Sequence, residues 1–201
     1  TTSAERVLST RESTNPYVYG QSAVFQEWDG ADWNVLVHDI EANTTTGLLT
    51  DAPADEIQPT VRGSWFSWLG DATRVFLVYA VALPEMMPTV VVQTPASVSA
   101  AGQASVVMDY TTLTWSDGRN VTDASPDTSS DFDVYGALLS GTSADVFPDD
   151  RSLVVPLEGQ FVTDSDSTIV VYTDYQDMNA DIGFVVYDST GAGTPVRLSR
   201  H

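Results

Sequence analysis

The sequence predicts an all-β fold made of about four copies of one strand-rich unit. A phrase is written twice, as "NPYVYG" at residues 15–20 and as "QPTVRG" at residues 58–63. Each copy leads into two runs of β-branched and aromatic residues around a short polar loop, which is typical of a β-hairpin. Helical periodicity is nearly absent, and Thr, Val, Ser, Asp and Gly favour strands and turns.

The first two units give the clearest strands. Each has a hairpin followed by a third β-rich run. In the first unit we expect strands at 22–28, 33–40 and 44–50, and in the second at 64–69, 74–81 and 88–94.

Two further units are looser, with expected strands at 111–118, 131–139 and 151–159, and at 167–175, 181–191 and 194–200. The central strand of every unit can be anchored on its first residue, which is Asp32, Thr73, Asp133 or Asp181. Seven residues later stand Asp39, Ala80, Ser140 and Asp188. Equal strand lengths in four places indicate a shared structural unit.

Repeats of about 45 residues with four strands each are typical of the blades of a β-propeller. Blade boundaries near residues 21, 64, 111 and 167 predict four four-stranded blades in a single domain, residues 1–201. Residues 1–14 are expected to form an N-terminal tail, in which 2–13 is a short helix or a frayed end.

The N-terminal strand is expected to close the ring. Residues 15–20 precede the first blade, whereas the last blade has three strands. We therefore expect 15–20 to be the outer strand beside 168–173 and 183–188. Pro16 suits an edge strand because it has no N–H to donate.

Residues 16–25 read P-x-V-x-G-x-x-x-V-F, and "DGADWNVLVHD" follows at 29–39. This pattern resembles the TolB-like, or WD40-like, β-propeller repeat, in which "DGNxDIYVYDLxTG" joins the two central strands. The second unit departs from it at Thr73 and Ala80, and the third carries an insertion at 119–131. The resemblance implies a periplasmic, cell-surface or secreted protein that binds partners, in a family that usually has more than four blades. It implies no single chemistry.

The charge restricts the partners. The net charge is −20, from 28 acidic and 8 basic residues. Such a surface repels phosphate backbones, so we expect no nucleic-acid partner. The acidity is explained either by a solvated shell suited to high salt, as in halophilic proteins, or by divalent-cation binding. No apolar run is long enough for a membrane-spanning helix.

Cysteine chemistry is excluded because Cys is absent. The sequons at Asn43 and Asn120 are compatible with export. The two histidines, His38 and His201, offer little for a Ser-His-Asp triad, and the G-x-S-x-G elbow is missing. We therefore predict that the chain is not an enzyme.

Calcium is the one cofactor that the sequence suggests, because oxygen ligands in loops suit Ca²⁺. The loops at 123–133 and 174–181 are the best candidates, although neither fits the EF-hand pattern. Asp is also frequent in turns, where its side chain accepts hydrogen bonds from nearby N–H groups. The predicted ligands are Asp123, Asp127, Asp131, Asp133, Asp174, Asp177 and Asp181.

The predicted function is an exported, non-enzymatic propeller that acts as a binding or assembly module for a protein or glycan at the cell surface. One alternative is a structural subunit that self-associates into filaments. A second is a secreted carbohydrate-active hydrolase or lyase.

Overall fold

The computed structural model describes residues 5–47, 55–63, 65–71, 76–82, 103–109, 112–118, 132–138, 151–154, 160–166, 168–175, 180–188 and 191–198. Every regular element in these segments is a β-strand, and every strand pairing is antiparallel. The all-β prediction is confirmed. In the described part of the chain, we find no helix with the length and hydropathy to span a bilayer.

The strands form four sheets in chain order. The first sheet holds β1 (Ser13–Tyr19), β2 (Ser22–Trp28), β3 (Trp33–Asp39) and β4 (Thr44–Gly47). The second holds β5 (Glu56–Arg62), β6 (Trp65–Asp71) and β7 (Phe76–Ala82). The third holds β8 (Gln103–Met108), β9 (Thr112–Asp117), β10 (Asp133–Leu138) and β11 (Arg151–Val154). The fourth holds β12 (Gln160–Asp166), β13 (Ile169–Asp174), β14 (Asp181–Asp188), β15 (Gly191–Ala192) and β16 (Val196–Arg197).

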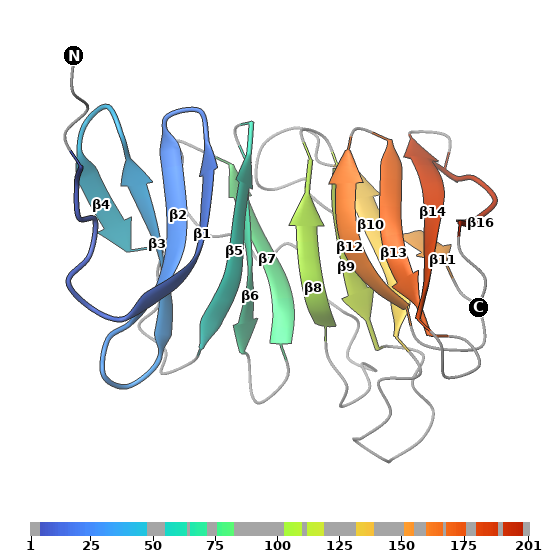
Figure 1. Ribbon diagram of the computed structural model, residues 1–201, viewed down its shortest axis with the longest axis horizontal. Helices are drawn as coiled ribbons and strands as arrows, with labels where there is room; N and C mark the ends of the chain where they lie inside the picture. Colours follow the sequence, from blue (N-terminus) through green and yellow to red (C-terminus); the bar gives the residue numbers. More distant parts are fainter. Residues whose placement is uncertain are drawn as a thin grey trace.

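The four sheets stand side by side in a row, with the two chain termini at opposite ends (Figure 1). Three apolar clusters fill the spaces between neighbouring sheets. Between the first and second sheets the core includes Val24 and Trp68, between the second and third it includes Trp65 and Trp115, and between the third and fourth it includes Val134. Alternation along each strand lets the second and third sheets bury both of their faces.

The predicted closure by the N-terminal strand is wrong. β1 pairs with β2 in its own sheet, in register from Ser13↔Glu27 to Tyr19↔Ser22. Gly20 lies between the two strands with φ +57°, which a two-residue hairpin turn requires, and Gly63 repeats this at φ +59°. The repeated phrase therefore forms the first strand of the first and second sheets. All four described sheets begin one strand earlier than the predicted blade boundaries.

The last sheet does not lack a strand, because β12 supplies its first one. No described ladder joins one sheet to another. The predicted strand at 88–94 lies outside the described residues, and the second sheet has three described strands. The assignment of residues 1–201 to one domain stays a prediction.

The repeated phrase encodes a β-bulge. Asn15 and Gln58, which precede the two prolines, have φ +50° and +52°, and Ser105 of β8 has φ +51°. At each of these places two residues of the first strand oppose one residue of the second strand. β12 also carries one extra residue, between Val162 and Asp164. Each first strand is therefore bent at a similar height, which increases its local twist.

Residues 5–12 are not helical, so the predicted short helix is wrong over these residues, and β1 begins at Ser13, inside the predicted tail of residues 1–14. The tail lies against the outer face of the first sheet. The Trp28 backbone N–H donates to the Glu12 carbonyl at 2.9 Å, and the Arg6 guanidinium donates to Asn43 Oδ1 at 2.8 Å.

Candidate functional site: a groove lined by the bulged strands

The four bulged strands share one groove. Its lining residues come from β1, β5, β8 and β12, and its volume is about 570 Å³. The residues are Asn15, Pro16, Tyr17, Gln58, Pro59, Thr60, Val106, Val107, Met108 and Asp164. The same irregularity that the phrase encodes therefore shapes a concave surface to which every sheet contributes.

Gln26, which does not itself line the groove, holds two of the lining residues in place by hydrogen bonds. This buried β2 residue accepts a hydrogen bond from Asn15 Nδ2 at 2.7 Å and another from the Gln58 backbone N–H at 3.0 Å, both at its Oε1. One amide oxygen thus links the bulges of the first and second sheets. An Ala at this position would leave two donors to find other partners, which is costly for buried groups.

Arg62 ties three sheets together where the first strands end. Its guanidinium lies over the Tyr19 ring, 5.4 Å from the ring centre, and its Nε donates to Asp109 Oδ1 at 3.3 Å. The Asp109 side chain is 1% exposed, so this pairing takes place largely away from water. The contact holds the ends of β1, β5 and β8 at fixed spacing.

The groove combines polar and apolar lining residues. Asn15, Gln58 and Thr60 are polar, whereas Pro16 and Pro59 have no N–H group to donate. Asp164, which is exposed, is the one charged residue among the lining residues, and its Oδ1 accepts a hydrogen bond from the Ser165 N–H at 2.8 Å. Val106, Val107 and Met108 make the opposite wall apolar.

The predicted calcium ligands that the structure describes, Asp133, Asp174 and Asp181, do not line this groove. Asp174 and Asp181 face each other across β13 and β14, and both are buried. The Arg197 guanidinium lies between them, with Nη2 2.7 Å from Asp174 Oδ2 and Nη1 3.3 Å from Asp181 Oδ2. The hydrogen bond to Asp174 is the main cause that raises the pKa of Arg197. One arginine therefore pairs with both carboxylates and offsets half of their charge.

Asp133 belongs to another sheet, where it pairs in register with buried Asp117. The Trp115 indole N–H donates to Asp117 Oδ2 at 3.0 Å. The remaining predicted ligands, Asp123, Asp127, Asp131 and Asp177, lie outside the described residues. Within the described segments, no three His, Asp or Glu side chains form a group that could hold a metal ion. The calcium site stays a prediction.

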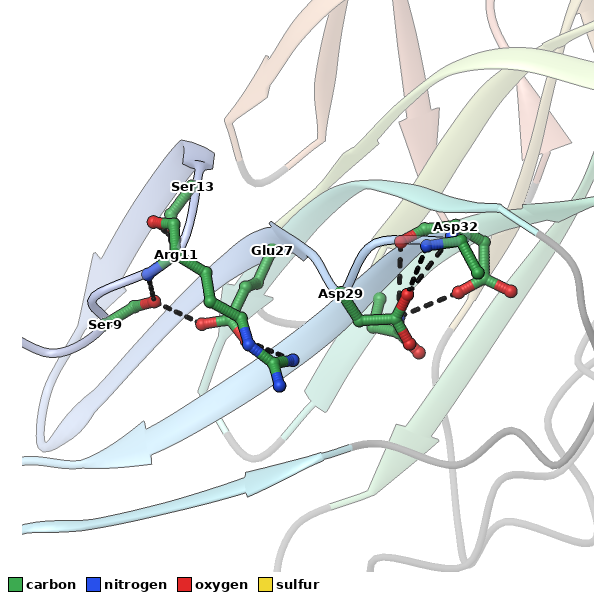
Figure 2. A network of polar contacts seen from close by, with 8 residues as sticks. Ser9, Arg11, Ser13, Glu27, Asp29 and Asp32 are labelled. Carbon is green, nitrogen blue, oxygen red and sulfur yellow. Dashed lines mark hydrogen bonds and ion pairs between the residues drawn. The ribbon is translucent and has the colours of Figure 1, made fainter.

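Asp29 has the role expected of an aspartate in a turn, where its side chain accepts hydrogen bonds from nearby backbone N–H groups. Its Oδ1 accepts hydrogen bonds from the Ala31 and Asp32 N–H groups, at 2.8 and 3.2 Å (Figure 2). These backbone hydrogen bonds hold the pKa of Asp29 below its usual value. His38 is buried on the first sheet, with Nδ1 2.9 Å from Thr45 Oγ1, and it does not line the groove.

The fold resembles several solved structures. TolB from Acinetobacter baumannii superposes with a TM-score of 0.63 at 8% identity, over 94% of this chain and 44% of that one. A puromycin-hydrolyzing peptidase from Mycobacterium tuberculosis gives a TM-score of 0.67 at 17% identity, over 98% of this chain and 30% of that one. A gluconolactonase from Xanthomonas campestris gives 0.54 at 13% identity, over 96% and 65%.

At these identities the likeness concerns the fold alone, and it supports a TolB-like β-propeller fold. The chain spans less than half the length of both the TolB protein and the peptidase. No protein-family model matches the sequence, and no curated protein sequence matches it.

The groove residues were not among the predicted site residues. Two signals pointed to them: the prolines at equal places in the repeated phrase, and the polar residue before each. Both are signs of an irregular strand. The contribution of β8 and β12 has no such signal, because Ser105 and Thr163 are ordinary strand residues.

Proposed function

We propose that the protein is an exported, non-enzymatic binding module, located in the periplasm, at the cell surface or outside the cell. The groove between the first strands holds part of a partner. The observation that carries this proposal is the convergence of four bulged strands, from four sheets, on one concave surface of about 570 Å³. Ligand sites of this size are typically preformed, concave and partly apolar.

The chemistry of the groove favours a partner segment that bears hydrogen-bond donors or a positive charge. The exposed Asp164 carboxylate is an acceptor at the groove, and the net charge of −20 attracts cations at long range. We therefore expect a basic peptide segment, with an Arg or Lys side chain directed at Asp164. A hydrolytic glycosidase site would need two opposed carboxylates, whereas Asp164 is the single one among the described lining residues.

The test is calorimetric titration with two capped tetrapeptides, Gly-Arg-Gly-Gly and Gly-Glu-Gly-Gly, at low salt. We expect the Arg peptide to bind and Asp164→Asn to weaken it about two- to fivefold, because exposed charge pairs contribute little. The matched control is Asp166→Asn, which removes an exposed charge from the same strand outside the groove. Equal losses in the two variants, or no difference between the peptides, would contradict the groove as the site.

A further inference from the structure

The outer face of the fourth sheet is apolar and bare. On β13 and β14, alternate residues point away from the third sheet, and Ile169, Ile182 and Val186 are 46%, 39% and 41% exposed. Val171, Thr173 and Phe184 share this face and are half-buried. Val196 and Leu198, beside β14 through the β16 pairing, add exposed apolar area. We call these residues of β13 and β14 the bare face.

The residues of the bare face occupy the same strand positions as the residues through which the other sheets contact the next sheet in the row. Counted from the hairpin turn, the pair Val171–Phe184 corresponds to Val24–Val37 of the first sheet. Val24 and Val37 are buried in the cluster that contains residues of the second sheet. The fourth sheet therefore presents the surface that elsewhere in this molecule receives another sheet.

The complementary surface exists at the other end of the row. The fourth residues of β6, β9 and β13 are Trp68, Trp115 and Tyr172, and each of them packs toward the preceding sheet. In the first sheet, the fourth residue of β2 is Phe25, which pairs with Leu36 of β3. No described sheet precedes the first one, and the tail lies there instead.

The tail is held mainly by polar contacts to Glu27, whose side chain is 15% exposed. Ser9 Oγ donates to Glu27 Oε2, and Arg11 Nη1 lies 3.4 Å from Glu27 Oε1 (Figure 2). Val7, by contrast, remains 78% exposed. The tail residues 7–11 and Leu36 also border a shallow pocket of about 360 Å³, so the tail leaves space above the sheet. Such a cover is replaceable, because an ion pair whose arginine is largely exposed contributes little and is screened by salt.

We propose that the bare face of one molecule docks on the outer face of the first sheet of a second copy, head to tail, and displaces residues 5–12. The contact would repeat the sheet-to-sheet packing already present three times within the chain. It is heterologous, so two copies form a ring if the rotation closes, and longer chains form if it does not. Because each copy carries −20, association requires salt to screen the repulsion.

The experiment is sedimentation equilibrium of the 201-residue chain and of a chain lacking residues 1–12, at low and molar salt. We expect the deletion to tighten association at least tenfold in molar salt. On this background, Ile169→Thr with Val186→Thr should restore the monomer. Val18→Thr, at an exposed position of β1 that pairs with Ala23 on the outer face of the first sheet, should also weaken association.

A second variant keeps the test decisive if the deletion does not fold. Glu27→Gln removes the partner of Arg11 and should raise association in the same direction but less strongly. Glu12→Gln, on the exposed tail, makes the same charge change and serves as its control. The proposal is overturned if the deletion and Glu27→Gln both remain as monomeric as the unmodified 201-residue chain. Association that persists after Ile169→Thr with Val186→Thr also overturns it.

Discussion

The two ends of the row of sheets have similar outer surfaces and different covers. At the first sheet, Phe25 is 5% exposed beneath the N-terminal tail. At the fourth sheet, Ile169 and Val186 stand opposite each other and are both more than 40% exposed. Figure 1 shows that these two sheets are the outermost of the four.

The difference shows what the repeat encodes and what it leaves to local sequence. The repeat supplies each sheet with two apolar faces, because alternation on strands such as β2 places Val24 and Phe25 on opposite sides. It does not encode what covers the outermost faces. At the first sheet this is decided by Ser9 and Arg11, which belong to no repeat and bind Glu27.

The largest effect is expected from truncating the aromatic residue of an interior sheet rather than that of the first sheet. Trp115→Ala empties a fully buried position and leaves Asp117 without the indole N–H, so we expect a loss of about 3–5 kcal/mol in the free energy of unfolding. Phe25→Ala should cost about 1–3 kcal/mol, because the tail can settle into the space. Urea denaturation of both variants gives the comparison. Equal losses would mean that the tail packs as firmly as a sheet.

Removing Arg197 should have the next largest effect. Arg197→Met leaves Asp174 and Asp181 facing each other, buried and without that cation. We expect a loss in the free energy of unfolding, measured by urea denaturation, that is smaller than that of Trp115→Ala because the arginine is partly exposed.

The same variant sharpens the calcium prediction. At matched ionic strength, Ca²⁺ should raise the melting temperature of Arg197→Met more than Mg²⁺ does if these carboxylates can bind it. If the two ions act alike in the variant and in the unmodified chain, the loop at 174–181 is not a calcium site.

The smallest effect concerns Tyr172, on the buried face of the fourth sheet. Burial, followed by the charge of Asp174, raises the pKa of its hydroxyl above the ordinary value. The folded chain therefore favours the protonated form. The contribution of protonated Tyr172 to the stability of the fold is complete below about pH 10. It is lost as the pH rises through the pKa that Tyr172 has in the folded chain.

Tyr172→Phe should flatten the alkaline decline of the melting temperature between about pH 9 and 11. The packing stays in place, because the ring still lies over Gly183, where even a Cβ would overlap it. Tyr175→Phe, at an exposed tyrosine, is the control and should leave the decline unchanged. Identical alkaline curves for both variants would show that Tyr172 is not buried as described.

The sequence predicted the strands well and their grouping poorly. Hydrophobic alternation located β3 and β14, because alternation reports burial of one face along a strand. The first strand of each sheet is flanked by turns on both sides, so pattern alone allows it to pair with the strand before or after it. The decisive signal was Gly20, whose place between two strands marks a two-residue hairpin.

The candidate groove could not be predicted from local sequence, because it depends on how the sheets pack together. Pro16 and Pro59 predict irregular strands, but their meeting in one groove requires the register of four sheets and the stacking between them. Asp164 is one acidic residue among 28, and nothing local distinguishes it. The Arg197 contact with Asp174 and Asp181 was equally hidden, since β16 reaches them only through its pairing with β14.

Carbene footprinting tests the contrast between the two ends most directly. The 201-residue chain and the chain lacking residues 1–12 would be labelled with a small diazirine at low salt and low concentration, then digested and analysed by mass spectrometry. We expect heavy labelling of β13 and β14 in both chains, and labelling of β2 and β3 that rises only when the tail is removed. Unchanged labelling of β2 and β3 after the deletion, or protection of β13 and β14 in the 201-residue chain, would contradict this contrast.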